Sequence, residues 1–431
     1  MHSEPIPTDA SHRMYRFVAG VGVVSLLLLV TFGTIDWWIG LIASVVIVAI
    51  ELSSRRFFPN NKFVRNLTLV GAMIGLQMFS AEVFCRAFLA QAIYYRPHEM
   101  LAQRHPKIEN LTRYAPNRTV EFKQTFGDLA SMVGDPARRD LRDIVFTTDE
   151  WGLRNDPGDS TEPIQLAILG DSFVVGNGTT QEATWGRLMR TRHHVATYNL
   201  GMPGSPWVTY AHLVEMADRL KFTSDAVWVL VLFSGNDLEG GYLSPKLSRI
   251  DQTRWDQYMV WRRKSVVRNL INRSIDQPAA STKVFFDEKL GHLLYSPYVV
   301  AYKRTTQQAH DHPNFSRMIR TIGNIQTLAD KHHVRFRVVV LPSKEEMLLG
   351  DLSTPSGFVS ALLPECSAKN WSCTDLKPLM VAADSTSEGR PWRDLWWRDD
   401  THINAAGHSA LTDIVYSIVK QDRGIRSASR F

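Results

Sequence analysis

Three long apolar runs dominate the first 90 residues of the chain. They cover about 17–35, 37–52 and 67–88, and the first carries no charged side chain. Each approaches the roughly 20 residues that a helix needs to cross a bilayer. No small-residue cleavage site follows the first run, so a secretory signal peptide is disfavoured. The pattern predicts that residues 1–90 form an N-terminal membrane region of three transmembrane helices rather than a buried helical hairpin.

The basic residues around these runs predict their orientation. Arg13 and Arg16 lie in the N-terminal tail and four basic residues lie in the loop 51–66, whereas the turn between the first two runs has none. Because cytoplasmic loops carry an excess of Lys and Arg, the tail and this loop are expected on the cytoplasmic side. Three crossings of the inner (cell) membrane then place the remainder of this multi-pass chain outside the cytoplasm, in the periplasm.

From residue 161 to about 420 the pattern changes to short apolar runs that alternate with amphipathic stretches. Four runs have the length of buried strands: Ile164–Leu169, Val195–Asn199, Ala226–Phe233 and Val334–Leu341. Strands that alternate with helical periodicity are typical of a parallel sheet covered by helices. The sequence therefore predicts an α/β domain in this part of the chain.

Two segments do not show this alternation of strands and helices. The stretch 91–160 is punctuated by prolines and has two candidate strands, Phe122–Phe126 and Ile144–Phe146, so we interpret it as a connecting collar subdomain. Within it, residues 147–155 are either a turn that packs a tryptophan or an edge of the active site. The aromatic-rich stretch of about 238–310 is predicted to be a largely helical insertion, either a cover for the active site or a surface decoration.

Composition and cysteines narrow the classes of function. The chain has 431 residues and a net charge of +6, but its Lys and Arg residues are scattered, which argues against nucleic-acid binding. Cys85 lies in an apolar run and is interpreted as a buried thiol. Cys366 and Cys373 lie in one polar loop without the further ligands of a zinc site, so a disulfide is favoured over a metal, with two free thiols as the remaining alternative. Such a bond requires an oxidising compartment, in agreement with the predicted orientation.

Polar residues at the ends of the predicted strands carry the candidate chemistry. Ser172, in the turn Gly170–Ser172, follows the first strand at the edge where open α/β sheets place their active sites, so it is a candidate nucleophile. Gly201 and Asn236 follow the second and third strands and could donate to an oxyanion. Lys344 ends the fourth strand, either as a contact to an anionic substrate group or as a solvated loop lysine.

The candidate base lies near the carboxyl end of the chain. His402 follows two carboxylates, Asp399 and Asp400, and a carboxylate at this distance can bond its Nδ1 atom and stabilise the imidazolium form. The spacing alone does not separate the two aspartates.

In this order the four blocks resemble the SGNH family of hydrolases, also called GDSL hydrolases, over about 161–420. The resemblance implies a flavodoxin-like three-layer α/β/α sandwich with a parallel sheet and acyl-ester chemistry without a metal or cofactor. It makes Ser172 the nucleophile and His402 the base, with the Ser172 N–H, the Gly201 N–H and the Asn236 amide as the oxyanion hole. The family usually has a glycine where this chain has Ser234.

A membrane-tethered branch, which includes alginate-type O-acetyltransferases, is similar in further details. Its Asp-x-His spacing would select Asp400 as the triad acid, whereas the spacing usual in the wider family, Asp-x-x-His, would select Asp399. The segment Pro342–Glu345 also looks like this branch.

These features predict a membrane-anchored, extracytoplasmic serine esterase or O-acyl(acetyl)transferase that acts on a glycan or another acyl ester. The expected partners are that substrate, the lipid bilayer and a glycan-synthesis complex, but no nucleic acid. The alternatives are a lipid esterase or thioesterase and a non-catalytic glycan-binding assembly subunit. Hydrolysis or transfer, the acyl donor and the acceptor stay open at this stage.

Overall fold

The computed structural model describes much of the chain beyond residue 110. The described residues are 111–124, 126–133, 138–239, 283–384 and 392–422, with scattered positions between 77 and 108. Nearly all of the three predicted membrane runs, Cys85 and the first part of the insertion lie outside them, so those predictions are untested. Within the described residues, no helix is both long and apolar enough to cross a membrane. The described residues from 98 onward belong to one compact unit.

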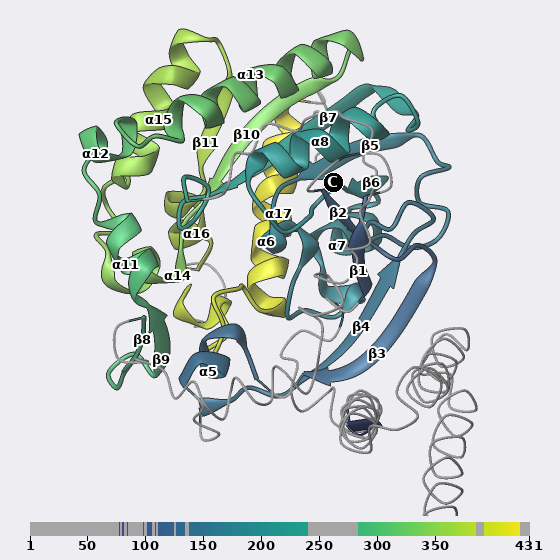
Figure 1. Ribbon diagram of the computed structural model, residues 1–431. Coiled ribbons are helices and arrows are strands. Elements are labelled where there is room, and N and C mark those ends of the chain that lie inside the picture. The colour runs from purple at the N-terminus through teal and green to yellow at the C-terminus, as the bar shows by residue number, and fades with distance from the viewer. Residues whose placement is uncertain are drawn as a thin grey trace, which may run out of the picture. The chain divides into compact units, whose positions relative to one another are not determined.

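A five-stranded parallel sheet forms the centre of this unit (Figure 1). Its order is β11-β10-β7-β5-β6, with bounds Ser372–Asp375, Arg335–Leu341, Phe222–Phe233, Ile164–Leu169 and Thr197–Asn199. All four pairings are parallel. The four predicted strands are confirmed, and the fifth, β11, was missed because this polar, incompletely buried edge strand lacks the apolar pattern.

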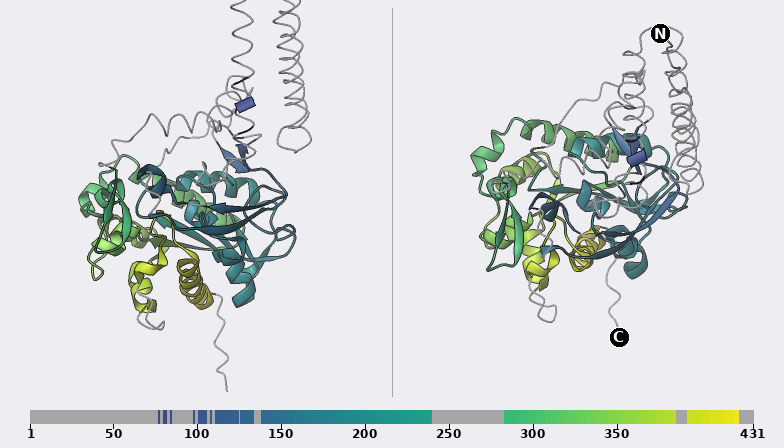
Figure 2. Two further views of the ribbon diagram at one scale, coloured as in Figure 1. Left: turned by 90° about the horizontal axis from the view of Figure 1, so that it is seen from below. Right: turned by 60° about the horizontal axis from the view of Figure 1, so that its bottom comes forward.

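Helices cover both faces of the sheet, which gives the predicted three layers. Helices α8 (Pro206–Met216), α13 (Phe315–Lys331) and α15 (Gly357–Ala368) pack on one face, and α7 (Trp185–His193), α16 (Lys377–Asp384) and α17 (Ala405–Asp422) on the other. In Figure 2 the green α13 and the yellow α17 lie on opposite sides of the strands.

The central strand β7 shows why this layering is stable. Trp228, Leu230 and Leu232 join the core on the side of α13, whereas Val229 and Val231 join the core on the side of α17. Successive side chains of a strand point to opposite faces, so a strand buried on both faces must be apolar throughout. Each buried aliphatic side chain contributes roughly 1.5–3 kcal/mol.

The segment before the sheet forms two antiparallel pairs and a short helix. β1 (Ala102–Arg104) pairs with β2 (Thr112–Tyr114), and β3 (Arg118–Gln124) pairs with β4 (Arg142–Thr148), with α5 (Asp128–Val133) between the last two strands. Both candidate strands of this segment are therefore confirmed, although β3 ends at Gln124. Phe122, Ile144 and Phe146 share one apolar core with the central sheet, which ties the segment to the main domain.

The described end of the insertion, residues 283–310, combines strands with helices, whereas the prediction for the whole insertion was largely helical. It begins with a hairpin of β8 (Val284–Asp287) and β9 (His292–Tyr295), and α11 (Ser296–Tyr302) and α12 (Thr306–His310) follow. Gly291 has a positive φ of 70° just before β9, a conformation that glycine adopts without strain, and the Leu290 N–H donates to Asp287 Oδ1 at 3.0 Å. This local turn chemistry favours a hairpin over a helix.

Cys366 and Cys373 form the predicted disulfide, which links the end of α15 to β11. We expect Cys373→Ser to lower the free energy of unfolding by about 2.5 kcal/mol, because a bridge that closes a short loop restricts the unfolded chain. The half-buried Cys373 is replaced rather than Cys366, because a serine at the buried Cys366 would also bury a hydroxyl.

Urea unfolding of the variant and of the wild type, each with and without a thiol reductant, measures this effect. The reductant should destabilise the wild type by the same amount and leave the variant unchanged. Equal stability of oxidised wild type and variant would contradict the prediction.

Candidate active site

Ser172 stands at the start of a short helix that follows the central strand β5. The side chain of Asp171 caps this helix, α6 (Ser172–Val175), by accepting the Phe173 N–H at 2.9 Å. A Cβ on Gly170 would lie 2.5 Å from the Val174 side chain, so the turn requires a glycine there. The first N–H groups of a helix have no partner within it, so the predicted donation of the Ser172 N–H to an oxyanion would not compete with a helical hydrogen bond.

The structure brings Ser172, His402 and Asp400 together in a chain of hydrogen bonds. Ser172 Oγ lies 2.8 Å from His402 Nε2, and His402 Nδ1 lies 2.7 Å from Asp400 Oδ1. The imidazole also stacks on Phe173, with 4.5 Å between the ring centroids. This is the order of nucleophile, base and orienting acid that activates a serine.

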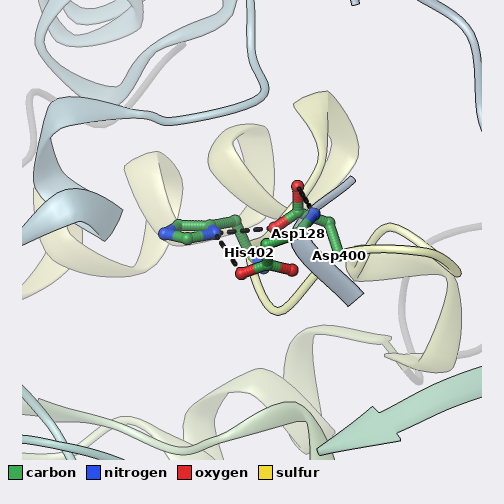
Figure 3. A group of neighbouring side chains, drawn as sticks. All are labelled: Asp128, Asp400 and His402. Carbon is green, nitrogen blue, oxygen red and sulfur yellow. Dashed lines mark hydrogen bonds and ion pairs between the residues drawn. The ribbon is translucent and has the colours of Figure 1, made fainter. Parts of the chain in front are cut away.

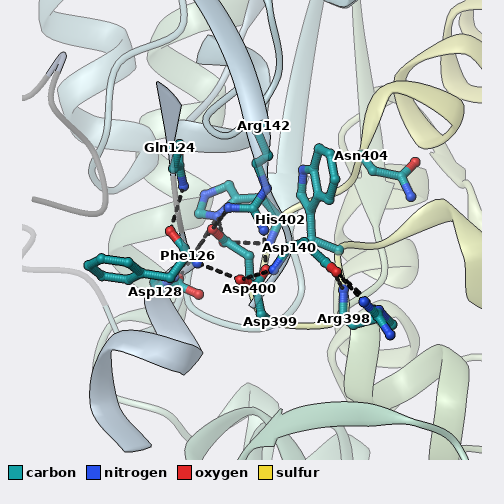
Figure 4. A network of polar contacts seen from close by, with 12 residues as sticks. Gln124, Phe126, Asp128, Asp140, Arg142, Arg398, Asp399, Asp400, His402 and Asn404 are labelled. Carbon is teal, nitrogen blue, oxygen red and sulfur yellow. Dashed lines mark hydrogen bonds and ion pairs between the residues drawn. The ribbon is translucent and has the colours of Figure 1, made fainter. Parts of the chain in front are cut away.

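Asp399 faces away from this chain and anchors the loop instead (Figure 4). Its Oδ2 accepts the Gly127 N–H at 2.7 Å and the Asp140 N–H at 2.9 Å, and its Oδ1 pairs with the Arg142 guanidinium. Burial raises the pKa of Asp399, and the charge of Arg142 opposes that rise. Of the two aspartates that the sequence left open, only Asp400 contacts the imidazole.

A third carboxylate, Asp128 on α5, lies beside the histidine and was not predicted. Its two oxygens accept the N–H of Thr401 at 2.8 Å and the hydroxyl of Thr401 at 2.6 Å. Its Oδ2 is 3.9 Å from His402 Nδ1 (Figure 3). No sequence signal marks Asp128, because it belongs to none of the recognised blocks and lies more than 200 residues before the histidine.

Asp128, Asp400 and His402 are also the one group in the described part of the chain that could hold a metal ion. One ligand atom from each lies within 4.8 Å of the others. An ion bound to His402 Nδ1 would displace the proton that this nitrogen shares with Asp400. In the structure Asp400 accepts from His402 Nδ1, and Asp128 accepts from Thr401. These hydrogen bonds suit a protonated Nδ1, which a histidine needs if its Nε2 atom is to act as a general base.

Two buried cations surround these carboxylates. Arg142 Nη1 lies 3.4 Å from Asp400 Oδ2, and its guanidinium covers the ring of Trp397 at 4.1 Å. Lys344 is fully buried, and its Nζ donates to the backbone oxygens of Asp400 at 2.8 Å and Trp397 at 3.2 Å. Burial lowers the pKa of Lys344. The interpretation of Lys344 as a solvated lysine was wrong, because it is buried and holds the loop that carries the acid, whereas a contact with a substrate stays a prediction.

The residues after Lys344 hold two further parts of the site. α14 (Lys344–Leu349) begins at the end of β10, and its Glu346 Oε2 accepts the Ser234 hydroxyl at 2.9 Å. That hydroxyl also accepts the Ser343 N–H at 3.1 Å, so the Ser234 side chain has two partners. Glu345 Oε1 accepts the Tyr295 N–H of the insertion at 2.8 Å.

The other two predicted oxyanion donors, Gly201 and Asn236, lie at the expected edge of the sheet, each with a partner in this structure. The Gly201 N–H donates to Asn199 Oδ1 at 2.8 Å, and a Cβ on Gly201 would lie 2.7 Å from the Val175 nitrogen of α6. Asn236 Nδ2 donates to the Tyr298 hydroxyl at 3.4 Å. Their action on an oxyanion remains a prediction.

The motif at 147–155 has a role beyond packing a tryptophan. Trp151 does pack against the main core, as one interpretation held. However, the buried Arg154 donates to the backbone oxygens of Val175 at 3.0 Å, Gly176 at 2.6 Å and Thr179 at 2.7 Å. Arg154 therefore braces the end of the helix that begins with Ser172, although it does not reach the reacting atoms.

Comparison with known proteins adds little to this geometry. No protein-family model and no curated protein match the sequence. Among solved structures, one that is similar is a member of the lipolytic protein G-D-S-L family from Veillonella parvula DSM 2008. It aligns with a TM-score of 0.32 and 11% sequence identity, over 59% of this chain and 97% of that chain. What the site can do therefore follows from its own contacts.

Proposed function

We propose that this protein is a serine esterase or O-acyltransferase. The observation that carries the proposal is the contact of Ser172 Oγ with His402 Nε2 at 2.8 Å, continued by the contact of His402 Nδ1 with Asp400 at 2.7 Å. A serine hydroxyl is a weak nucleophile on its own and needs an adjacent base of this kind.

In the proposed reaction Ser172 Oγ attacks the carbonyl carbon of an ester and His402 Nε2 takes the hydroxyl proton. The negative charge develops on the carbonyl oxygen, where the Ser172 N–H, the Gly201 N–H and the Asn236 amide are the proposed donors. As the C–O bond breaks, the imidazolium returns the proton to the leaving alcohol. Water or an acceptor hydroxyl then cleaves the acyl-enzyme by the reverse sequence.

The carboxylates around the imidazole support this cycle. Asp400 fixes the tautomer with Nε2 free to accept a proton and stabilises the imidazolium that forms. Asp128 adds a second negative charge 3.9 Å from Nδ1. Arg142 and Lys344 lie near the same carboxylates and favour their ionised forms.

The finer proposal is a membrane-anchored, extracytoplasmic enzyme that moves or removes an acetyl group on a glycan within a glycan-synthesis complex. The three apolar runs, the distribution of basic residues and the Cys366–Cys373 bridge support the location. The resemblance to alginate-type O-acetyltransferases supports the substrate. A lipid esterase or thioesterase would use the same chemistry and differ in chain-length preference.

Covalent labelling of the purified full chain in detergent tests the proposal. Ser172 Oγ is expected to displace fluoride from a fluorophosphonate, and peptide mass spectrometry should locate the phosphonyl ester on Ser172. Preincubation with an aryl acetate should slow labelling. Absence of both labelling and ester turnover would overturn the proposal in favour of a non-catalytic binding subunit.

Aryl esters from acetyl to dodecanoyl then separate the candidate substrates. A preference for acetyl supports the glycan enzyme, whereas a preference for long chains supports a lipid esterase. An oligosaccharide acceptor that becomes acetylated identifies a transferase, and acetate release without acetylated sugar identifies a hydrolase.

A further inference from the structure

The described end of the insertion is joined to the active site by hydrogen bonds. The Tyr295 N–H, just before α11, donates to the fully buried Glu345 at 2.8 Å. The Leu293 N–H of β9 donates to the backbone oxygen of Arg398 at 2.9 Å, next to the loop that carries Asp400. In Figure 1, α11 and α14 lie side by side below the sheet, as their contacts require. These contacts hold α11 in a fixed position and argue against a loose surface decoration.

α11 directs Tyr298 toward the carboxyl end of β7. The Tyr298 ring packs edge-on against Phe233, the last residue of β7, with centroids 5.5 Å apart, and against Tyr295 at 4.8 Å. Phe233 in turn stacks on Phe173, the residue after the candidate nucleophile, at 4.1 Å. Aromatic packing on two sides limits the motion of the phenol and thereby orients its hydroxyl.

The hydroxyl meets the residue whose amide is the proposed oxyanion donor. Asn236 Nδ2 lies 3.4 Å from the Tyr298 oxygen and donates to it. A phenol oxygen that accepts a hydrogen still has its own hydrogen to donate. Because the phenol oxygen accepts a hydrogen bond from the Asn236 amide, its own O–H is polarised and becomes a stronger donor.

The charges around Tyr298 keep this hydrogen in place. Burial raises the pKa of Tyr298 well above its usual value, and the nearby carboxylates of Asp128, Glu345 and Asp171 raise it further. The phenol is therefore neutral at physiological pH, so it can donate but not act as a base.

We propose that Tyr298 is a further catalytic residue of the proposed acyl transfer, whose phenol O–H donates to the acyl oxygen held by the Asn236 amide. The inference rests on the proposed function. In the free enzyme the Tyr298 oxygen lies 3.4 Å from Asn236 Nδ2. A substrate oxygen that accepts a hydrogen bond from the same Asn236 amide would therefore lie close to the Tyr298 hydroxyl. The phenol keeps its proton throughout, so the step is electrostatic stabilisation of the oxyanion without proton transfer.

Tyr298→Phe in the full chain tests this role, because it removes the hydroxyl and keeps the ring in its packing. With an aryl acetate, we expect kcat to fall about 10²-fold, the lower end of the cost of losing one oxyanion donor, with KM nearly unchanged. Tyr295→Phe is the matched control, since it removes a hydroxyl from the neighbouring residue and keeps the ring that packs on Tyr298, and its kcat should stay within about twofold of wild type.

A boronic acid that forms a tetrahedral adduct on Ser172 distinguishes a substrate contact from a structural effect. A group that donates to the oxyanion stabilises the bound boronic acid as it stabilises the transition state. Tyr298→Phe should therefore lower the affinity for the boronic acid by the same factor by which it lowers kcat/KM. Turnover of Tyr298→Phe within twofold of wild type, or a loss of kcat without loss of analogue affinity, would overturn the role of Tyr298. An inactive, unlabelled wild type would instead overturn the proposed function.

Discussion

Ser172→Ala is expected to lower kcat on an aryl acetate by about 10⁶-fold, to the level that binding and oxyanion donors alone support. The hydroxyl of Ser172 is the atom 2.8 Å from the base, and alanine leaves His402 without a nucleophile to activate. The fold should be intact, because the side chain is only half-buried and is small. Initial rates of phenol release, with circular dichroism as the check on folding, measure the effect.

Ser409→Ala is the matched control for this substitution. It removes a hydroxyl that accepts from the exposed Arg192 at 2.9 Å, outside the triad, and kcat should be unchanged. If Ser172→Ala turned over at the rate of this control, the serine mechanism would be contradicted.

Asp400→Asn is expected to lower kcat by about 10⁴-fold, whereas Asp399→Asn should keep kcat within about tenfold of wild type. The difference follows from their contacts, because Asp400 bonds His402 Nδ1 at 2.7 Å and Asp399 bonds the segment that includes Gly127 and Arg142. An asparagine at 400 can donate to the imidazole and so favour the tautomer that cannot accept the Ser172 proton. Steady-state kinetics of the two isosteric variants give the comparison.

The stabilities of the same two variants should show the opposite order. Asp399→Asn leaves the buried Arg142 without its main partner and is expected to lower the free energy of unfolding by about 3 kcal/mol. Asp400→Asn should lower the free energy of unfolding by less, because the contact between Asp400 and Arg142 is longer, at 3.4 Å. If urea unfolding shows that both variants are folded and both lose the same factor in kcat, the assignment of Asp400 as the triad acid is contradicted.

The strands and the chain order of the site residues were predictable because they depend on local patterns. A strand buried on both faces must be apolar throughout, so β5, β7 and β10 stand out from the sequence. Residues at the carboxyl ends of neighbouring parallel strands share one edge of the sheet, so Ser172, Gly201 and Asn236 were expected near one another. The edge strand β11 and the β8–β9 hairpin escaped this pattern, because one is polar and the other is set by turn chemistry.

The supporting residues of the site could not be predicted in the same way. Asp128 and Arg142 come from a segment more than 250 residues before His402, and their contacts depend on how that segment packs on the sheet. Lys344 was misjudged because a lysine at a strand end is usually solvated, whereas here the loop of Asp400 covers it. Tyr298 belongs to an insertion whose position no periodicity reveals.

The sequence by itself determined the α/β class and the serine and histidine of the candidate site, and it favoured the Cys366–Cys373 bond that the structure then showed. Each depends on residue types at short spacing, which local chemistry restricts. Only the tertiary structure decided which aspartate faces the imidazole. Asp399 and Asp400 are equivalent by type and neighbours in sequence, but distant backbone N–H groups and the Arg142 charge engage the first and leave the second for His402.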